Sequence, residues 1–290
     1  KVLVNWDPQE SFTQHVRSAH FSGEVCLGTF NGEFLLQGGI PVHCGITNAS
    51  LHNVTLGNNC IVRNVSDYIA NYVFGDCCLI DNVDLIYADG ESRFGNGEVV
   101  SVLNETGGNE IVITDILTSQ TAWFMATNSP SGEKIKELSY RYADGTKASV
   151  GSVGTMVTIR NAGTLMNVCL GDYATVDGAA RLVNGTVNSC EKAPAKVGKN
   201  VIADDFIFSS GSHVEDAAII NKCFIGQASH VGRGFSVAES VIFSNCHFEN
   251  GEGCAIFAGP FSVSHHKATL LIAGAFSFFN AGSGSNQSNH

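Results

Sequence analysis

Blocks of six residues recur along the chain, and this period most constrains its fold. Residues 225–242 contain three successive blocks, IGQASH, VGRGFS and VAESVI, and related blocks begin at Leu56, Phe74 and Leu170. Such hexads are typical of a parallel β-helix, in which a short strand turns a corner every six residues and three sides complete a coil. An amphipathic helix would need apolar residues at i, i+3, i+4 and i+7, a pattern these blocks lack.

A histidine row follows from the same period. His213, His230 and His247 are seventeen residues apart, and each precedes Val or Phe. One coil of about eighteen residues would stack these apolar residues inward and the histidines outward, about 5 Å apart along one edge. The sequence therefore predicts an all-β protein, a parallel β-helix of hexapeptide repeats with a short helical insertion.

Composition limits the function. The 290 residues include 32 glycines and 5 prolines, which suits many tight turns, and the net charge of −11 argues against nucleic acid as a partner. The ten cysteines show no C-x-x-C pair, and no signal peptide or apolar run of membrane length is visible. We therefore predict reduced cysteines, a cytoplasmic location and no membrane association.

The organisation along the chain is predicted as five segments. Residues 1–20 would form an entry segment whose Trp6 and Phe12 cover the open end of the coil. Coils would occupy 21–84 and 156–280, and 281–290 would form a polar tail or loop. Residues 85–155 would form an insertion with two short helices. Candidate signals for these helices are caps at Thr114 and Ser131, one helical face with Ile135, Leu138 and Tyr142, and a stop at Gly145.

Five stretches carry a resemblance to known proteins: HFSGEVCLG (20–28), IANYVFGD (69–76), FGNGEVVSVLNETGGNE (94–110), SSGSHVED (209–216) and residues 256–290. On these stretches, the chain resembles an uncharacterised bacterial family, domain of unknown function 4954. The resemblance extends over nearly the whole chain. At the level of the fold it resembles the left-handed hexapeptide-repeat acyltransferases. The resemblance implies a left-handed coil and a trimer with sites between subunits, and it implies that family members continue beyond residue 290.

The first candidate site contains two adjacent histidines. In sugar acetyltransferases of that superfamily, a rung with Gly-Pro precedes a histidine that acts as general base. Gly259-Pro260 followed by His265 and His266 is similar to this arrangement. The resemblance thus implies His265 or His266 as the base on an acceptor hydroxyl, a role that suits neutral imidazole. A histidine pair bonded to a neighbouring turn is the alternative.

The second candidate is a polar segment for ligand binding. Amide, hydroxyl and cationic side chains follow large aromatic residues near the end of the chain, and such groups can hold a sugar or phosphate. The predicted ligand-binding residues are Lys267, Asn280, Ser283, Ser285, Asn286 and Asn289. Ordinary turn chemistry is the alternative.

The third candidate is a metal site on the histidine row. His213, His230 and His247 are possible ligands, although three histidines in a straight ladder spread too far for one ion. The carboxylates of Glu215 and Asp216 are interpreted as exposed corner residues.

Two functions remain open. The chain could be an acyltransferase-like enzyme that acts on a sugar or nucleotide-sugar, with acetyl-CoA or another acyl thioester as donor. Alternatively, it could be a non-catalytic scaffold that binds a sugar or nucleotide-sugar and forms homo-oligomers. No Walker loop, nucleophile elbow or HExxH motif is present to decide between them.

Overall fold

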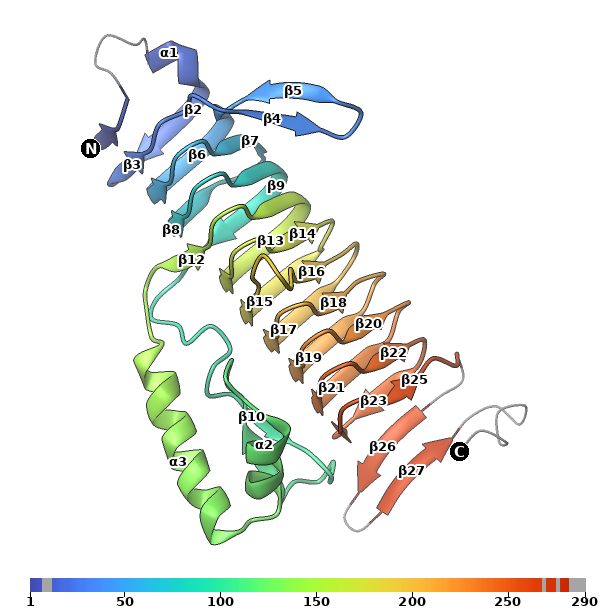
Figure 1. Cartoon of the computed structure of the whole chain (residues 1–290). Coiled ribbons are helices and arrows are strands. Elements are labelled where there is room, and N and C mark those ends of the chain that lie inside the picture. Colours follow the sequence, from blue (N-terminus) through green and yellow to red (C-terminus); the bar gives the residue numbers. More distant parts are fainter. Residues whose placement is uncertain (7–11, 268–269, 275–276, 282–290) are drawn as a thin grey trace.

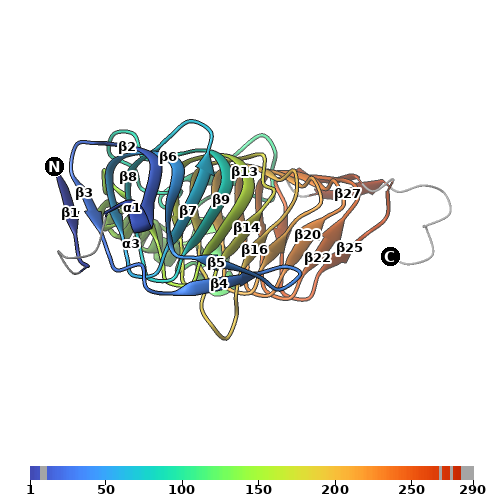
Figure 2. The same cartoon turned by 90° about the horizontal axis from the view of Figure 1, so that it is seen from above.

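The computed structural model describes residues 1–6, 12–267, 270–274 and 277–281 and shows a mostly β protein with a core of parallel strands (Figure 1). The coils lie in one row from β3 at the N-terminal end to β25 (Figure 2). The early coils contain β1 (Val2–Val4), β2 (Val16–Ser22), β3 (Val25–Leu27), β6 (Gly45–Leu56), β7 (Ile61–Val65), β8 (Ile69–Phe74) and β9 (Leu79–Tyr87).

The later coils continue the row with short strands of the same kind. They contain β12 (Gly151–Val153), β13 (Thr158–Leu170), β14 (Thr175–Asp177), β15 (Arg181–Val187), β16 (Lys196–Val197), β17 (Ile202–Phe208), β18 (His213–Val214), β19 (Ile219–Ile225), β20 (His230–Gly232), β21 (Ser236–Ile242), β22 (His247–Glu249), β23 (Glu252–Cys254), β24 (Phe257–Ala258) and β25 (Val263–Ser264). The antiparallel pair β26 (Leu270–Gly274) and β27 (Ser277–Ala281) follows.

The register of the parallel pairs confirms the predicted coil. Ile61 pairs with Leu79, and Ile202 pairs with Ile219, so the chain returns to the same place after about one coil. Val214, Val231 and Phe248 lie in register and are buried, as the hexads predict. Stacking these apolar positions gives each coil two neighbours to pack against, which no single coil could supply for itself.

Asparagine occupies many corners. Asn53, Asn71, Asn161 and Asn167 have φ between 51° and 56°, a left-handed conformation that asparagine tolerates better than most residues. Their side chains bond between coils: Asn53 Nδ2 donates to Asn71 Oδ1 at 3.1 Å, and Asn167 Nδ2 donates to Asn184 Oδ1 at 3.2 Å. These ladders satisfy polar groups at the corners and fix the stacking of one coil on the next.

A long excursion separates β9 from β12, yet the coil resumes in register, because Thr158 pairs with Leu79. The excursion contains the antiparallel pair β10 (Val99–Ser101) and β11 (Glu110–Val112), then α2 (Ser119–Ala126) and α3 (Pro130–Gly145). It packs outside the later coils (Figure 1). Its apolar residues form a second core with outward-facing residues of β17, β19 and β21 and their neighbours, namely Ile207, Phe224, Val241 and Phe243.

The helix signals were only partly correct. The N-caps are Thr118 and Ser129, not Thr114 and Ser131, because Pro130 occupies the first turn of α3 and the hydroxyl of Ser129 accepts from the N–H of Gly132. Ile135, Leu138 and Tyr142 all belong to α3, where Ile135 packs against the second core and Leu138 is 60% exposed. The predicted end of the helix at Gly145 is confirmed.

Two further elements lie near the N-terminus. Trp6 is buried and packs against Phe30 beside the short helix α1 (Phe12–His15), whereas Phe12 is 41% exposed. The hairpin of β4 (Glu33–Leu36) and β5 (Ile40–His43) extends from the first coils (Figures 1 and 2). Within the described ranges, no helix is long and apolar enough to cross a membrane.

Candidate functional site

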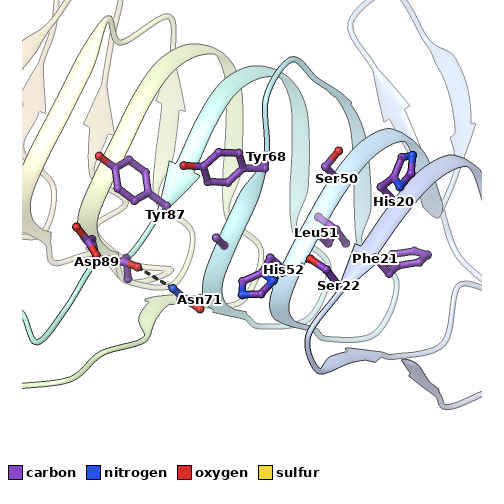
Figure 3. A pocket seen from close by; sticks show the side chains of 12 residues that line it. His20, Phe21, Ser22, Ser50, Leu51, His52, Tyr68, Asn71, Tyr87 and Asp89 are labelled. Carbon is purple, nitrogen blue, oxygen red and sulfur yellow. Dashed lines mark hydrogen bonds between the residues drawn. The ribbon is translucent and has the colours of Figure 1, made fainter. Parts of the chain in front are cut away.

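A groove of about 610 Å³ crosses the outer face of the first coils (Figure 3). Its walls come from β2, β6, β8 and β9 and the residues beside them. Its main polar and aromatic side chains are His20, Ser50, Tyr68, Asn71, Tyr87 and Asp89.

The strand register explains why the groove forms. Ser22, His52, Ala70 and Tyr87 pair in sequence across four neighbouring strands and so form one outward row. Alternate residues of a strand face opposite sides, so the residues that directly precede His52, Ala70 and Tyr87 point into the core. The small side chain of Ala70 separates the larger His52 and Tyr87, and this difference in size hollows the surface between them.

One wall of the groove contains a serine–histidine pair. His52 Nδ1 lies 2.8 Å from Ser22 Oγ, and His52 Nε2 lies 3.0 Å from Asn53 Nδ2. The N–H of Glu24 donates to Asn53 Oδ1, which fixes the amide with its nitrogen toward His52. Because an amide nitrogen only donates, His52 carries its proton on Nδ1 and donates to Ser22. A nucleophilic serine needs the opposite arrangement, in which the histidine accepts.

The opposite wall offers an aromatic pair beside polar groups. The rings of Tyr68 and Tyr87 lie 6.3 Å apart at 63°, and Tyr68 is 37% exposed. Tyr87 Oη lies 3.0 Å from Met166 Sδ, which anchors that ring. Asn71 Nδ2 donates to the carbonyl of Ala88, and the exposed carboxylate of Asp89 lies nearby (Figure 3).

The charge of the groove restricts its ligand. Among the described residues that line it, none is Lys or Arg, and Asp89 contributes a carboxylate. Phosphate recognition usually needs cationic side chains or converging N–H groups. A neutral molecule with many hydroxyl groups therefore fits these walls better than an anionic one.

The predicted histidine row is in register, since His213 pairs with His230 and His230 pairs with His247. The structure separates its members, however. His230 and His247 converge with Glu249, whereas His213 is exposed and lies outside this group. Glu215 is not the exposed corner residue that the sequence predicted, because its side chain is only 21% exposed and contacts His230 and Lys196.

Electrostatics hold both glutamates ionised. Lys196 donates to Glu215 and lowers the pKa of that carboxyl. Burial alone would raise the pKa of Glu249, but the hydrogen bond from His247 and the charge of Arg233 outweigh it and lower the pKa. Two buried or half-buried carboxylates thus remain charged beside two histidines at neutral pH.

His265 and His266 lie near the last coil. Their rings are 4.8 Å apart, and Asn250 Nδ2 donates to the carbonyl of His265. Pro260 lines a separate hollow of about 430 Å³ between the insertion and the coils, and neither histidine is among the residues that line it. The structure therefore does not bring the Gly-Pro rung and the two histidines together in that hollow.

The predicted ligand-binding residues divide into three groups. Lys267 is exposed beside the two histidines, and Asn280 belongs to β27. Ser283, Ser285, Asn286 and Asn289 lie outside the described residues.

Sequence reasoning missed the groove and both glutamates. The signal for the glutamates was present: His213 and His247 are each followed two residues later by Glu, and residues i and i+2 of a strand share a face. The groove had a weaker signal, because it depends on which outward side chains are small. Ala70 belongs to an ordinary hexad and shows its importance only when His52 and Tyr87 are placed beside it.

The fold and the groove define a mostly β protein, built from parallel coils, with a hollow lined by polar and aromatic side chains on its first coils. The chain belongs to the family described as "Domain of unknown function (DUF4954)", whose model matches residues 4–290. It is also 24% identical over 213 residues to an uncharacterized protein of Treponema pallidum (strain Nichols). That match covers 69% of this chain and 29% of the other protein, so the chain spans less than a third of the length of this relative.

Proposed function

We propose that this chain is a saccharide-binding module, a left-handed β-helix of hexapeptide repeats that holds an uncharged sugar in the groove of its first coils. The hexads support the coil, and the resemblance to left-handed hexapeptide-repeat proteins at the level of the fold implies its hand. One observation carries the function: two neighbouring tyrosines, Tyr68 and Tyr87, line a hollow whose other walls offer hydroxyl, amide and carboxylate groups but no Lys or Arg. Aromatic faces pack on the apolar faces of sugar rings, while amide, hydroxyl and carboxylate groups bind their hydroxyls.

The ligand class follows from charge. The sequence left open a sugar or a nucleotide-sugar, and the groove favours the former because a diphosphate would meet Asp89 and no Lys or Arg among the residues that line it. A volume of about 610 Å³ is within the usual range for small-molecule sites and suits one or two sugar rings.

The test is a titration of the protein with neutral mono- and disaccharides and with the matching nucleotide-sugars, followed by calorimetry or ligand-observed NMR. Tyr68→Ala should weaken saccharide binding roughly fivefold to tenfold, because it removes an aromatic contact worth about 1 kcal/mol. The matched control is Tyr140→Ala, since Tyr140 is similarly exposed (40%) but lies on α3. Tighter binding of the nucleotide-sugars, or equal binding by wild type and Tyr68→Ala, would contradict the proposal.

Acyl transfer is the second candidate. The accessible pair His265 and His266 favours it, because a half-buried imidazole next to an exposed one offers a base within reach of solvent-borne substrate. In this proposal the donor is acetyl-CoA or another acyl thioester, and a trimer places the pair at a subunit boundary. Release of free CoA thiol in the presence of a sugar, lost in the double variant His265→Ala/His266→Ala, would support it. No thiol release, or a monomer in light scattering, would count against it.

A reducing compartment fits both candidates. All ten cysteines lie in described residues and none is paired, although Cys60 and Cys78 are buried in neighbouring coils. We therefore propose that the protein works in the cytoplasm.

A further inference from the structure

We propose that His230, His247 and Glu249 form a binding site for one Zn²⁺ ion. The three residues lie on β20 and β22, which pair in register, so His230 and His247 face each other across neighbouring coils. Glu249 lies two residues after His247 on the same face of its strand. Two imidazoles and one carboxylate are a ligand set that zinc uses when it keeps a fourth position for water.

The distances fit a single ion. His230 Nδ1 and His247 Nε2 are 3.0 Å apart, and Glu249 Oε1 lies 2.9 Å from His247 Nε2 and 3.6 Å from His230 Nδ1. Ligands about 2.05 Å from zinc in a tetrahedron are roughly 3.3 Å apart, which falls inside this range. A point about 2.05 Å from all three atoms lies about 0.9 Å out of their plane, close to the value of about 0.7 Å in a regular tetrahedron.

The neighbouring groups orient the ligands. His230 Nε2 lies 3.2 Å from Glu215 Oε1, so it carries the proton and leaves Nδ1 free to bind a metal. A carboxylate on the far nitrogen of a metal-binding histidine is the usual support for such a ligand. Glu215 is itself held by Lys196 at 2.8 Å, through its other oxygen.

Glu249 is oriented in the same way. Arg233 Nη1 binds Glu249 Oε2 at 2.9 Å, which directs Oε1 toward the two histidines. The middle coil carries Gly232 where the coils on either side carry Glu215 and Glu249, and a Cβ at Gly232 would lie 3.2 Å from His230 Cε1. The missing side chain thus gives the His230 ring room between the two carboxylates.

The same geometry distinguishes the site from the straight ladder considered from sequence. His213 extends the row by one coil but has no part in the group, and Glu249 takes the third position instead. Without metal, the proton on His247 Nε2 is shared between Glu249 Oε1 and His230 Nδ1. Binding of Zn²⁺ at Nε2 requires the neutral His247 ring to carry its proton on Nδ1 instead, so the proton changes nitrogen and no net proton is released.

The experiment is calorimetric titration of chelator-treated protein with ZnCl₂, with MgCl₂ as the metal that should not bind. Wild type should bind one zinc that His247→Ala abolishes. Because the His247 side chain is 49% exposed, this variant should fold, and its thermal midpoint checks that it does. Glu215→Gln should weaken binding by about tenfold, the usual effect of losing such a support. The control His213→Ala removes an exposed histidine of the same row and should bind zinc as wild type does.

Three results would overturn the proposal: no zinc bound by wild type, equal zinc binding by a folded His247→Ala variant, or equal losses in His213→Ala and His247→Ala. The second result would assign any bound zinc to cysteines or to histidines elsewhere in the chain, and the third would assign it to the whole histidine row rather than to the group with Glu249.

Discussion

Replacing Tyr72 with phenylalanine tests the packing inside the coil. Tyr72 lies on β8 and is 1% exposed, and its hydroxyl crosses the coil interior to Val168 on β13. The hydroxyl donates to the carbonyl of Val168 at 2.8 Å and accepts from its N–H at 3.0 Å. This one oxygen connects a strand that precedes the insertion to a strand that follows it.

The expected cost follows from the two groups left without a partner. A buried N–H or carbonyl that loses its partner costs about 1–3 kcal/mol, and phenylalanine fills the same volume, so no cavity adds to the cost. We expect Tyr72→Phe to lower the free energy of unfolding by about 2 kcal/mol. In a chain of 290 residues that shift lowers the thermal midpoint by roughly 3 °C.

The assay is urea denaturation followed by circular dichroism, with Tyr140→Phe as the control at an exposed position of α3. The control should change the free energy of unfolding by less than about 0.5 kcal/mol. If Tyr72→Phe is also within about 0.5 kcal/mol of wild type, the hydroxyl does not satisfy the Val168 peptide, and the reasoning is refuted. Gly151→Ala should be destabilising too, since its Cβ would lie 2.3 Å from the Tyr72 ring.

Three further predictions concern other parts of the molecule. Burial alone would raise the pKa of Asp81, but the paired hydrogen bonds from Arg63 lower this pKa overall. The stability that the pair contributes is therefore full above about pH 4 and is lost as the pH falls further. Acid denaturation should accordingly be less steep in Asp81→Asn. Phe224→Ala should lower the free energy of unfolding by about 3–5 kcal/mol and make the insertion sensitive to protease before the coils are. Simultaneous cleavage of the insertion and the coils would contradict a separate second core. Ser22 should not react with a fluorophosphonate probe, because His52 donates its proton to it; a Ser22 adduct in mass spectrometry would show that the pair is active.

Much of the coil could be predicted from sequence because its period is a local property. Each hexad places its first residue inward, and Val214, Val231 and Phe248 are buried as this rule requires. The alignment of His213 with His230 follows from the same count. These predictions needed only the length of one coil.

The proposed zinc site depends on two spacings at once. His247 and Glu249 are two residues apart in one strand, and His230 and His247 are one coil apart. Only the two spacings together bring three ligand atoms to one point. Reading adjacent residues such as Glu215 and Asp216 as a pair misses this, because neighbours in a strand face opposite sides.

The insertion could not be placed from sequence for a different reason. Its apolar residues would suit any apolar surface, and the surface they meet consists of outward residues such as Phe224 and Val241 on coils that follow it in the chain. In a hexad these outward apolar residues look like exceptions to the pattern. They mark the face that the insertion covers, so exceptions to a regular repeat locate its partners, just as Ala70 among larger neighbours locates the groove.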